Sequence, residues 1–563
     1  MKRDISAFGG NKFDIVIVGG GITGAFLALD ASLRGFSTAL VEKGDFGTAT
    51  SSASSKLLHG GIRYLQEGRI FKVRESAMER AYFQKLAPHL TRWVPFVIPT
   101  YKGFRRGSLL LRAGMAAYEA ACLGQNGLFQ DPGKKVPRGK YLNKGQVAEV
   151  VPGMRLEGLT GGILFFESHM HNSERMVLAV LDTASRAGAK VGNYLRADSF
   201  MLEGERVVGI RVRDMVADAD FEIRASVVVN AAGPWIPQLN ATLAERRSTG
   251  IVKAFSKGIH LVTRPLTNGC AIALATRKQN QGMINRGGRH VFIIPWRGYS
   301  LVGTSYGPYE GDLDALQPLE EDVLELLADV NSALGSEVLR RGDVRSAFAG
   351  IYPLTDDHIN PLVYQGTGDY QILDHGEKDG IEGLVSVFGA KYTTARLLAE
   401  KAINRIARKL LHRRTRCRTR HVPLVSGQIT DLAAYRIAMI ERFKGFAPAA
   451  AIEQLIFNHG AGAPAILELI RENPALSEPL LPPYEVLAAE VVHAVLQEQA
   501  IRLEDVVFRR TGLGTLGHPG RPALCRCADL MGDVLGWDKS RKDEEIRKIE
   551  AGFKFLNVAS CQT

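Results

Sequence analysis

Apolar runs and glycines alternate in a regular order near the start of the chain. Asp14 to Val18 is a short run rich in β-branched residues, as expected of a strand buried on both faces. It leads into the sequence GGGITG at 19–24, and residues 25–34 then follow a helical pattern that Gly35 ends. A second apolar run, Thr38 to Val41, comes next. The pattern predicts a strand, a glycine turn, a helix and a second strand.

The glycine turn has the spacing G-x-G-x-x-G at Gly19, Gly21 and Gly24. In this context the first glycine permits a tight turn, the second lets the backbone approach a pyrophosphate, and the third lets the helix pack closely on the sheet. The N-terminus of that helix offers N–H groups to phosphates. Glu42 lies 18 residues after Gly24, where a carboxylate accepts hydrogen bonds from ribose hydroxyls. We therefore expect an adenine dinucleotide to bind here.

The remaining pattern divides the chain into three parts. Strand patterns within 251–305 indicate a largely antiparallel sheet inserted into the nucleotide-binding part, and residues 429–555 are helical in period with no strand pattern. We predict an α/β protein with a Rossmann-type domain, an interleaved antiparallel-sheet substrate domain and a C-terminal α-helical domain, divided as 1–420 and 421–563. Beyond the first unit, helices are expected around 56–66, 71–86, 109–123, 173–187, from 393, 452–458, 464–471, 484–497 and 525–535, and strands at 164–167, 207–212, 221–229, 258–263, 290–295, 299–304 and 384–388.

Composition and charge narrow the class of protein. The 563 residues are 45% hydrophobic and 23% charged, which is ordinary for a globular protein of two or three domains. No apolar run reaches the roughly 18 residues of a membrane span, and the N-terminus lacks the apolar core of a secretion signal. We therefore expect an intracellular protein. The net charge of +12 favours anionic substrates, acidic membranes or nucleic acid, without choosing between them.

Cysteines and histidines give little sign of a metal site. The six cysteines are dispersed, and the one close pair, Cys525 and Cys527, has no matching second pair, so reduced thiols are expected. His169 and His171 lack a surrounding carboxylate pattern. We interpret both as polar histidines of a loop and expect no metal.

Five sequence blocks make a more specific resemblance. These are GGGITG, TATSSASSKLLHGGIRYL, VVVNAAGPW at 227–235, IPWRGYSLVGTS at 294–305 and SVFGAKYTTARLLAE at 386–400. In order and spacing they resemble FAD-dependent glycerol-3-phosphate dehydrogenases, over about 13–401 and more weakly in the C-terminal helices. The second block is the most discriminating, because many flavoproteins share the glycine motif.

The resemblance implies FAD as the cofactor and a set of residues that would hold it. The polar stretch after Glu42 can lay hydroxyls and N–H groups along a cofactor, and the FGAKYTT block returns to it. The expected FAD-binding residues are Gly19, Gly21, Ile22, Thr23, Gly24, Glu42, Thr50, Ser51, Ser55, Lys56, Leu57, His59, Gly389, Lys391 and Thr393.

Substrate residues are also implied by the resemblance. An arginine, a tyrosine and a lysine of the family correspond to Arg63, Tyr64 and Lys391, and cations of this kind bind a phosphate by charge-assisted hydrogen bonds. For the base that takes the hydroxyl proton, His260 and His59 are candidates, because histidine titrates near neutral pH. A buried structural role is an equal alternative for each histidine.

One position departs from the family pattern. Where the family carries a phosphate-clamping arginine, this chain has Tyr352 in the sequence GIYPL. A neutral hydroxyl in place of a bidentate cation weakens phosphate binding unless another cation compensates. Arg345 or Arg297 are the candidates for that role. The alternative is a different hydroxy compound or an amine as substrate.

Expected partners follow from the resemblance and the charge. The reduced flavin would pass electrons to a membrane quinone, and the protein would lie peripherally on the inner face of the cytoplasmic membrane. The basic stretch 401–421 is either solvated or in contact with anionic lipid, and helix 109–123 is either an inter-domain or a membrane-contact helix. No aromatic interleaving accompanies the arginines, so no nucleic acid partner is expected. The oligomeric state is open, with a homodimer as one option.

Overall fold

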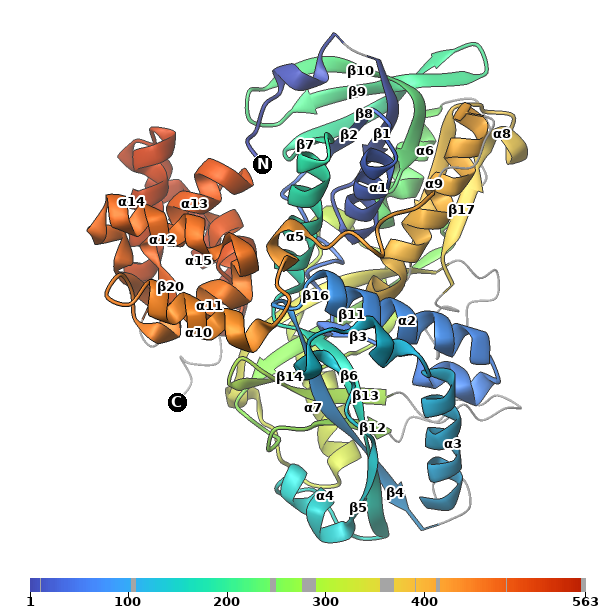
Figure 1. Cartoon of the computed structure of the whole chain (residues 1–563), viewed down its shortest axis with the longest axis vertical. Helices are drawn as coiled ribbons and strands as arrows, with labels where there is room; N and C mark the ends of the chain where they lie inside the picture. The colour runs from blue at the N-terminus through green and yellow to red at the C-terminus, as the bar shows by residue number, and fades with distance from the viewer. Residues whose placement is uncertain are drawn as a thin grey trace.

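The computed structural model describes residues 1–10, 12–102, 108–243, 250–275, 290–354, 369–389, 391–411, 416–481 and 484–557. In Figure 1 one sheet with its helices occupies the top of the view, a second sheet lies below it, and the C-terminal helices form a separate body beside both. The predicted α/β class with a helical C-terminal part is confirmed.

The first sheet contains the predicted strand–turn–helix–strand unit. Its parallel strands run in the order β7, β2, β1, β10 and β18, with β1 in the middle, and β17 and β9 pair antiparallel at its borders. The strands are β1 (Lys12–Val18), β2 (Thr38–Val41), β7 (Lys190–Gly192), β8 (Leu195–Glu203), β9 (Arg206–Asp214), β10 (Ala219–Asn230), β17 (Gln371–Asp374) and β18 (Leu384–Phe388).

Both faces of β1 are buried, as its unbroken apolar sequence predicts. Ile15 and Ile17 pack in one core with helices α1 (Ile22–Leu33), α5 (Ser173–Arg186) and α9 (Ala395–Leu411), whereas Val16 and Val18 pack in another core beneath β8 and β9. Successive side chains of a strand point to opposite faces, so one apolar run serves both cores.

The second sheet is largely antiparallel, as predicted, with one parallel pair between β12 and β4. Its central order is β11, β14, β13, β12, β4, β6 and β3, with β16 alongside β11. The strands are β3 (Leu57–Leu58), β4 (Thr91–Tyr101), β5 (Lys140–Asn143), β6 (Leu159–Met170), β11 (Ala254–Thr263), β12 (Ala271–Ala275), β13 (His290–Trp296), β14 (Tyr299–Gly303), β15 (Gly307–Pro308) and β16 (Val344–Leu354). The remaining helices before the C-terminal part are α2 (Ile70–Leu86), α3 (Ser108–Ala121), α4 (Lys144–Val150), α6 (Ile236–Asn240), α7 (Glu320–Leu334) and α8 (His375–Lys378).

The helix expected around 56–66 is wrong over its first half. Leu57 and Leu58 form β3, and only Ile62–Glu67 is a short 3₁₀ helix. Gly60 and Gly61 separate the two because the backbone passes close to neighbouring side chains. A Cβ on Gly60 would lie 1.9 Å from the Tyr118 hydroxyl, and Gly61 has a positive φ of 80°.

The C-terminal part has its own apolar core, drawn from residues between 439 and 553. Its helices are α10 (Leu432–Arg442), α11 (Ala449–His459), α12 (Ala463–Glu472), α13 (Ala488–Glu498), α14 (Arg521–Leu535) and α15 (Lys539–Asn557). The expectation of no strand is wrong, because β19 (Pro479–Leu481) and β20 (Tyr484–Leu487) pair there. The proline-rich sequence at 479–483 opposes the helix expected from 484, which begins at Ala488 instead.

The basic stretch 401–421 bears on the membrane question. Arg420 pairs with Glu400 at 2.6 Å, so this arginine of the 401–421 stretch is held by the protein. Arg413 and Arg414 lie outside the described residues. Within the ranges given above, no helix combines the length and apolarity needed to cross a bilayer.

Candidate active site

The glycine turn between β1 and α1 is built by close backbone approach. Gly19 has a φ of 111°, and a Cβ there would lie 2.5 Å from the carbonyl oxygen of Ala231. A Cβ on Gly24 would lie 1.9 Å from the carbonyl oxygen of Gly19. The end of β10 returns to this turn, since the Ala231 N–H donates to Val18 O at 2.9 Å. The packing requires glycine at Gly19 and Gly24, and it leaves the N-terminus of α1 facing the NAAGPW turn.

Glu42 lies at the edge of the same turn. Its carboxylate accepts hydrogen bonds from the N–H of Gly20 at 2.6 Å and from the N–H of Gly44 at 2.9 Å. Burial raises the pKa of Glu42, and those two N–H groups oppose the rise. An ionised carboxylate has about four acceptor positions, so Glu42 keeps capacity for the two hydroxyls of a ribose.

The polar loop after Glu42 folds against both the turn and the second sheet. The Ser51 hydroxyl accepts the N–H of Ile22 at 3.0 Å, at the start of α1. The Thr50 hydroxyl donates to the carbonyl oxygen of Ile351 in β16 at 3.0 Å, and Ser55 is half-buried in the same loop. Ser51 therefore sits where a pyrophosphate on the helix N-terminus would be contacted, whereas Thr50 ties the loop to the second sheet.

Lys56 differs from the other expected cofactor residues. Its ammonium donates to Ser52 O at 2.6 Å, to the Ser173 hydroxyl at 2.9 Å and to Glu174 at 2.7 Å. All three ammonium donors are thus used within the protein. The residue holds the loop to α5, and its side chain has no donor left for a cofactor. Leu57, the next residue, is buried in β3.

The FGAKYTT block closes the site from the other side. A Cβ on Gly389 would lie 3.3 Å from the Thr23 hydroxyl, and the Thr393 hydroxyl accepts the N–H of His59 at 3.0 Å. The expected cofactor residues of the turn, the polar loop and this block therefore meet around one place. The glycine cradle, the helix N-terminus and Glu42 fit the phosphate and ribose groups of FAD.

Tyr64 and Lys391 come together although they lie in separate blocks. The Lys391 ammonium is 3.6 Å from the centroid of the Tyr64 ring, and the ring is 6% exposed. The His59 ring lies 5.8 Å from the Phe292 ring of β13 in a tilted contact, close to the same group. Burial lowers the pKa of His59; Glu167 opposes the shift, and Lys391 adds to it. The backbone of Arg63 lies in the adjoining 3₁₀ helix, and its side chain is outside the described part.

Sequence reasoning missed the residues that support this loop. Arg80 is fully buried and donates to Glu167 at 2.6 Å, and the other contact of the same Glu167 oxygen is the Gly60 N–H at 2.7 Å. Arg80 also donates to the Tyr118 hydroxyl at 3.0 Å. The pair fixes the LHGG segment that carries His59. No local pattern marks it, because the two partners lie on α2 and β6.

His260 is buried beside the polar loop. Its ring stacks at 5.3 Å on Phe348, its pKa is lowered to about 3 by burial and by Lys56, and neither ring nitrogen has a hydrogen-bond partner among the described residues. A buried polar group without a partner is costly and points to a ligand or water in the functional state. His260 is therefore neutral, with a nitrogen open to accept a proton.

The cations proposed to compensate for Tyr352 lie elsewhere. Tyr352 pairs with Ser256 of β11, next to the polar loop. Arg345 is exposed at a bulge near the other end of β16, seven positions away or about 20 Å, and stacks at 4.9 Å on Tyr299. Arg297 donates to the carbonyl oxygen of Gly512 and to the Thr515 hydroxyl. The structure does not bring Arg345 to Tyr352, and it directs Arg297 to the C-terminal part.

The loop interpretation is wrong for His169 and correct for His171. His169 is fully buried in β6, whereas His171 lies in the bend after the strand and stacks at 5.4 Å on Phe457. Burial lowers the pKa of His171 to about 3 and also lowers the pKa of His169, so both rings serve as packed neutral groups. The strand is longer than the apolar run that predicted it, which is why His169 was placed outside it.

The fold and the site together define an FAD-binding oxidoreductase. Residues 14–402 match the family described as FAD dependent oxidoreductase, and residues 417–542 match the C-terminal domain of alpha-glycerophosphate oxidase. The chain belongs to the family of FAD-dependent glycerol-3-phosphate dehydrogenases.

Three similar proteins illustrate the relation. Glycerol-3-phosphate dehydrogenase of Synechocystis is 30% identical, over 97% of both chains. The protein of the same name from Mycobacterium leprae is 32% identical, over 97% of this chain and 88% of its own. The structure of glycerol-3-phosphate dehydrogenase from Bacillus halodurans complexed with FAD has a TM-score of 0.76 and 26% identity, over 98% of this chain and 96% of that one.

Proposed function

We propose that this protein oxidises sn-glycerol 3-phosphate to dihydroxyacetone phosphate. The observation that carries the proposal is the meeting of Tyr64 and Lys391 beside the glycine turn, in a chain whose full-length relatives are named for that substrate. FAD, when bound, supplies the acceptor for the hydride of the secondary alcohol. The chain's own residues bind the phosphate, orient the alcohol and take up the hydroxyl proton.

In this proposal Lys391, Tyr64 and Arg63 bind the phosphate by charge-assisted hydrogen bonds. His260 takes the hydroxyl proton as general base, with His59 as the alternative. The pKa of His260, about 3, keeps its imidazole neutral and able to accept the proton. A dianionic substrate close by would raise that pKa toward the working pH. Both histidines and Tyr352 stay proposals for catalysis and substrate contact.

Tyr352 supports a second candidate within the same class of chemistry. Its neutral hydroxyl stands where a cation is expected, and Arg345 is about 20 Å away along the strand. Another hydroxy compound or an amine would need no phosphate clamp. The names of the relatives favour glycerol 3-phosphate over this alternative.

The test is anaerobic reduction of the bound flavin. Glycerol 3-phosphate should bleach the visible flavin band, whereas glycerol, a 2-hydroxy acid and glycine should leave it unchanged at the same concentration. Bleaching by one of the others alone would favour the second candidate. A Tyr352→Arg variant should lower the KM for glycerol 3-phosphate, because it restores a bidentate cation.

We also propose that a membrane quinone accepts the electrons. The motivation is the family relation together with the basic charge of the chain. Stopped-flow mixing of the reduced protein with a short-chain ubiquinone should reoxidise the flavin faster than dissolved oxygen does. Faster reaction with oxygen would make the protein an oxidase instead.

Peripheral attachment to the inner face of the cytoplasmic membrane is a related proposal. Ile70 and Phe71, at the start of α2, are 54% and 90% exposed, and Leu123, just after α3, is 68% exposed. Arg74 of α2 connects the start of α2 with the segment after α3, because it donates to the carbonyl oxygen of Leu123 at 3.1 Å. An exposed apolar cluster beside cations suits the surface of an anionic bilayer.

Binding to vesicles of anionic phospholipid tests the attachment. Phe71→Ser should weaken binding roughly ten-fold or more, because a buried Phe contributes about 1.5–3 kcal/mol. The matched control is Ile437→Ser on α10, which is 71% exposed and far along the chain from the cluster. Equal loss in both variants, or no vesicle binding at low salt, would remove the proposal.

Three further expectations stay predictions. The domain division at 420 can be checked by limited proteolysis, the cytoplasmic location by cell fractionation, and a homodimer by light scattering.

A further inference from the structure

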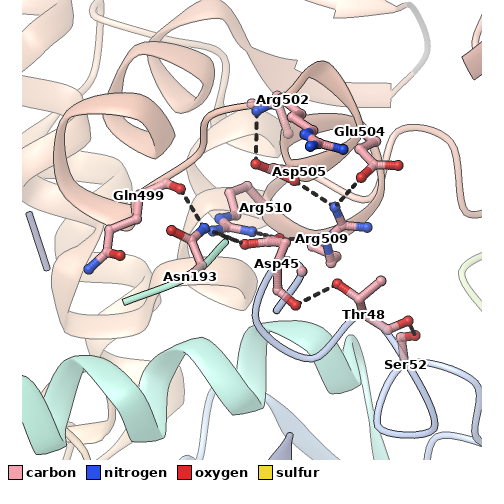
Figure 2. A network of polar contacts seen from close by, with 12 residues as sticks. Asp45, Thr48, Ser52, Asn193, Gln499, Arg502, Glu504, Asp505, Arg509 and Arg510 are labelled. Carbon is pink, nitrogen blue, oxygen red and sulfur yellow. Dashed lines mark hydrogen bonds and ion pairs between the residues drawn. The ribbon is translucent and has the colours of Figure 1, made fainter. Parts of the chain in front are cut away.

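The loop that carries Glu42 also contains Asp45, a carboxylate that is bound by arginines of the C-terminal part. Asp45 lies three residues after Glu42, and its side chain is fully buried although it belongs to a loop. Arg509 Nε donates to its Oδ2 at 2.5 Å, and Arg510 Nη2 donates to its Oδ1 at 2.8 Å. Arg510 Nη1 also donates to Oδ2, and the Asn193 side-chain amide donates to Oδ1 at 3.0 Å. Figure 2 shows both guanidinium groups directed at this one carboxylate.

Arg509 and Arg510 are fixed on their own side. Both belong to a π-helical turn, Asp505–Arg510, in which Arg509 donates to Asp505 at 2.6 Å and Arg510 donates to the carbonyl oxygen of Glu498 at 2.7 Å. In a regular α-helix adjacent side chains diverge and do not face one partner. The widened turn lets two consecutive arginines converge on Asp45, and turns of this kind are frequent at functional sites.

On the other side, Asp45 is followed by short-range hydrogen bonds within the loop. The Thr48 hydroxyl donates to the backbone carbonyl oxygen of Asp45 at 2.5 Å, and the Ser52 hydroxyl donates to the backbone carbonyl oxygen of Thr48 at 2.8 Å. Glu42 is joined to the same segment, because its carboxylate accepts the N–H of Gly44 at 2.9 Å, and Ser51 accepts the N–H of Ile22 at the start of α1. The segment 42–52 is therefore held by its own short-range hydrogen bonds, with Glu42 and Ser51 at the dinucleotide-binding turn and the Asp45 side chain at the C-terminal part.

Attachment of the C-terminal part does not by itself require this cluster. Arg175 of α5 forms another buried pair, with the Glu498 carboxylate at 2.7 Å, and Arg297 bonds the loop at 512–515. Burying two more arginines with Asp45 and Asp505 is expensive, and such clusters seldom add net stability. A role in fixing the position of one loop accounts for retaining them.

We propose that the C-terminal helical part belongs to the flavin-binding apparatus: Arg509 and Arg510 are positioning residues that hold Asp45 and so set the loop bearing Glu42 and Ser51 for FAD. Neither arginine touches the dinucleotide site. Coupling between two sites is reciprocal, so bound FAD must in turn tighten the Asp505–Arg510 turn.

The first test compares two variants of the same interface. Arg510→Gln should weaken FAD binding by about 5- to 150-fold, measured by titrating the deflavinated full-length protein and following flavin fluorescence. The control, Glu498→Gln, removes a charge of similar burial at the same interface but leaves Asp45 in place. It should lower the thermal midpoint of the apo-protein and leave FAD affinity unchanged. Equal loss of FAD affinity in both variants would overturn the proposal.

The second test needs no substitution and covers the case in which Arg510→Gln fails to fold. Hydrogen exchange of the wild-type protein with and without FAD should show added protection at 505–511, beyond the dinucleotide site itself. The reference segment is α12, Ala463–Glu472, which should exchange equally in both states. If the hydrogen-exchange rates at 505–511 are the same with and without FAD, the proposal is overturned.

Discussion

The ammonium of Lys391 lies 3.6 Å from the centroid of the Tyr64 ring. A cation held over an aromatic face gains about 0.5–2 kcal/mol, so each residue fixes the other before any substrate arrives. Lys391 lies three residues after β18 and Tyr64 lies in the short helix after β3, so the contact joins segments that follow strands of the two sheets. It places a positive charge and a hydroxyl beside His59.

The first prediction concerns this cation. Lys391→Met should reduce kcat/KM for glycerol 3-phosphate by roughly 10- to 100-fold, since a hydrogen bond to a charged group contributes about 1.5–3 kcal/mol. Steady-state assays measure the change. The much slower turnover of unphosphorylated glycerol at far higher concentration should be unaffected. Lys401→Met is the control, because that lysine lies over Tyr370 with its side chain 45% exposed. Equal losses for both substrates would assign Lys391 a different role.

The second prediction concerns the glycine turn. Gly24→Ala should yield protein without flavin, because the new Cβ would lie 1.9 Å from Gly19 O and force the turn open. Overpacking of this kind costs about 1–3 kcal/mol, and here it falls on the cofactor cradle. The flavin-to-protein absorbance ratio checks it. Gly114→Ala in α3, whose Cβ would meet Leu65 only at 3.9 Å, should keep its flavin.

Local pattern was sufficient where the structure depends on local rules. The run Thr38–Val41 and the strand Leu384–Phe388 were predicted to the residue, because both are short apolar strands buried on two faces. Local pattern did not predict the structure at Gly60, because Arg80 and Tyr118 from other elements impose the backbone conformation there. Tertiary contacts of this kind leave no periodic trace in the sequence.

The site was predictable in part for the same reason. Glu42 and the glycines follow a fixed spacing within one strand–helix–strand unit, so they could be named from sequence. The contact that supports this unit could not be predicted from sequence, because Asp45 and Arg510 are 465 positions apart. Arg345 was a candidate to compensate for Tyr352, but both residues lie on β16 and the extended strand separates them.

The third prediction concerns the buried pair beneath His59. Arg80→Met should lower the free energy of unfolding by about 3–5 kcal/mol, because Glu167 is left as an uncompensated buried charge. Urea unfolding at pH 7 measures it. Arg196→Met, which breaks an exposed pair with Asp198, should cost no more than about 1 kcal/mol. The double change Arg80→Met with Glu167→Gln should recover part of the loss, and a further loss would show that the two side chains act separately.

The fourth prediction is a pH dependence at Asp45. Burial alone would raise its pKa, but Arg510 and Arg509 outweigh burial and lower the pKa from 3.8 to about 2. Since the folded pKa lies below the unfolded one, ionised Asp45 stabilises the fold above about pH 4, and this contribution is lost as the pH falls through 2. The shift corresponds to about 2 kcal/mol.

Asp45→Asn should therefore lower the free energy of unfolding at neutral pH relative to the wild type, and it should also lower the pKa of Asp505, which burial and Asp45 raise to about 6. The difference should narrow by about 2 kcal/mol as the pH is lowered toward 2, because protonation removes from the wild type the charge that the variant lacks. Urea unfolding at a series of pH values measures it, with Asp198→Asn as the exposed control. A difference that stays constant to pH 2 would mean that Asp45 acts through its shape and hydrogen bonds, and that its charge does not hold the arginines in place.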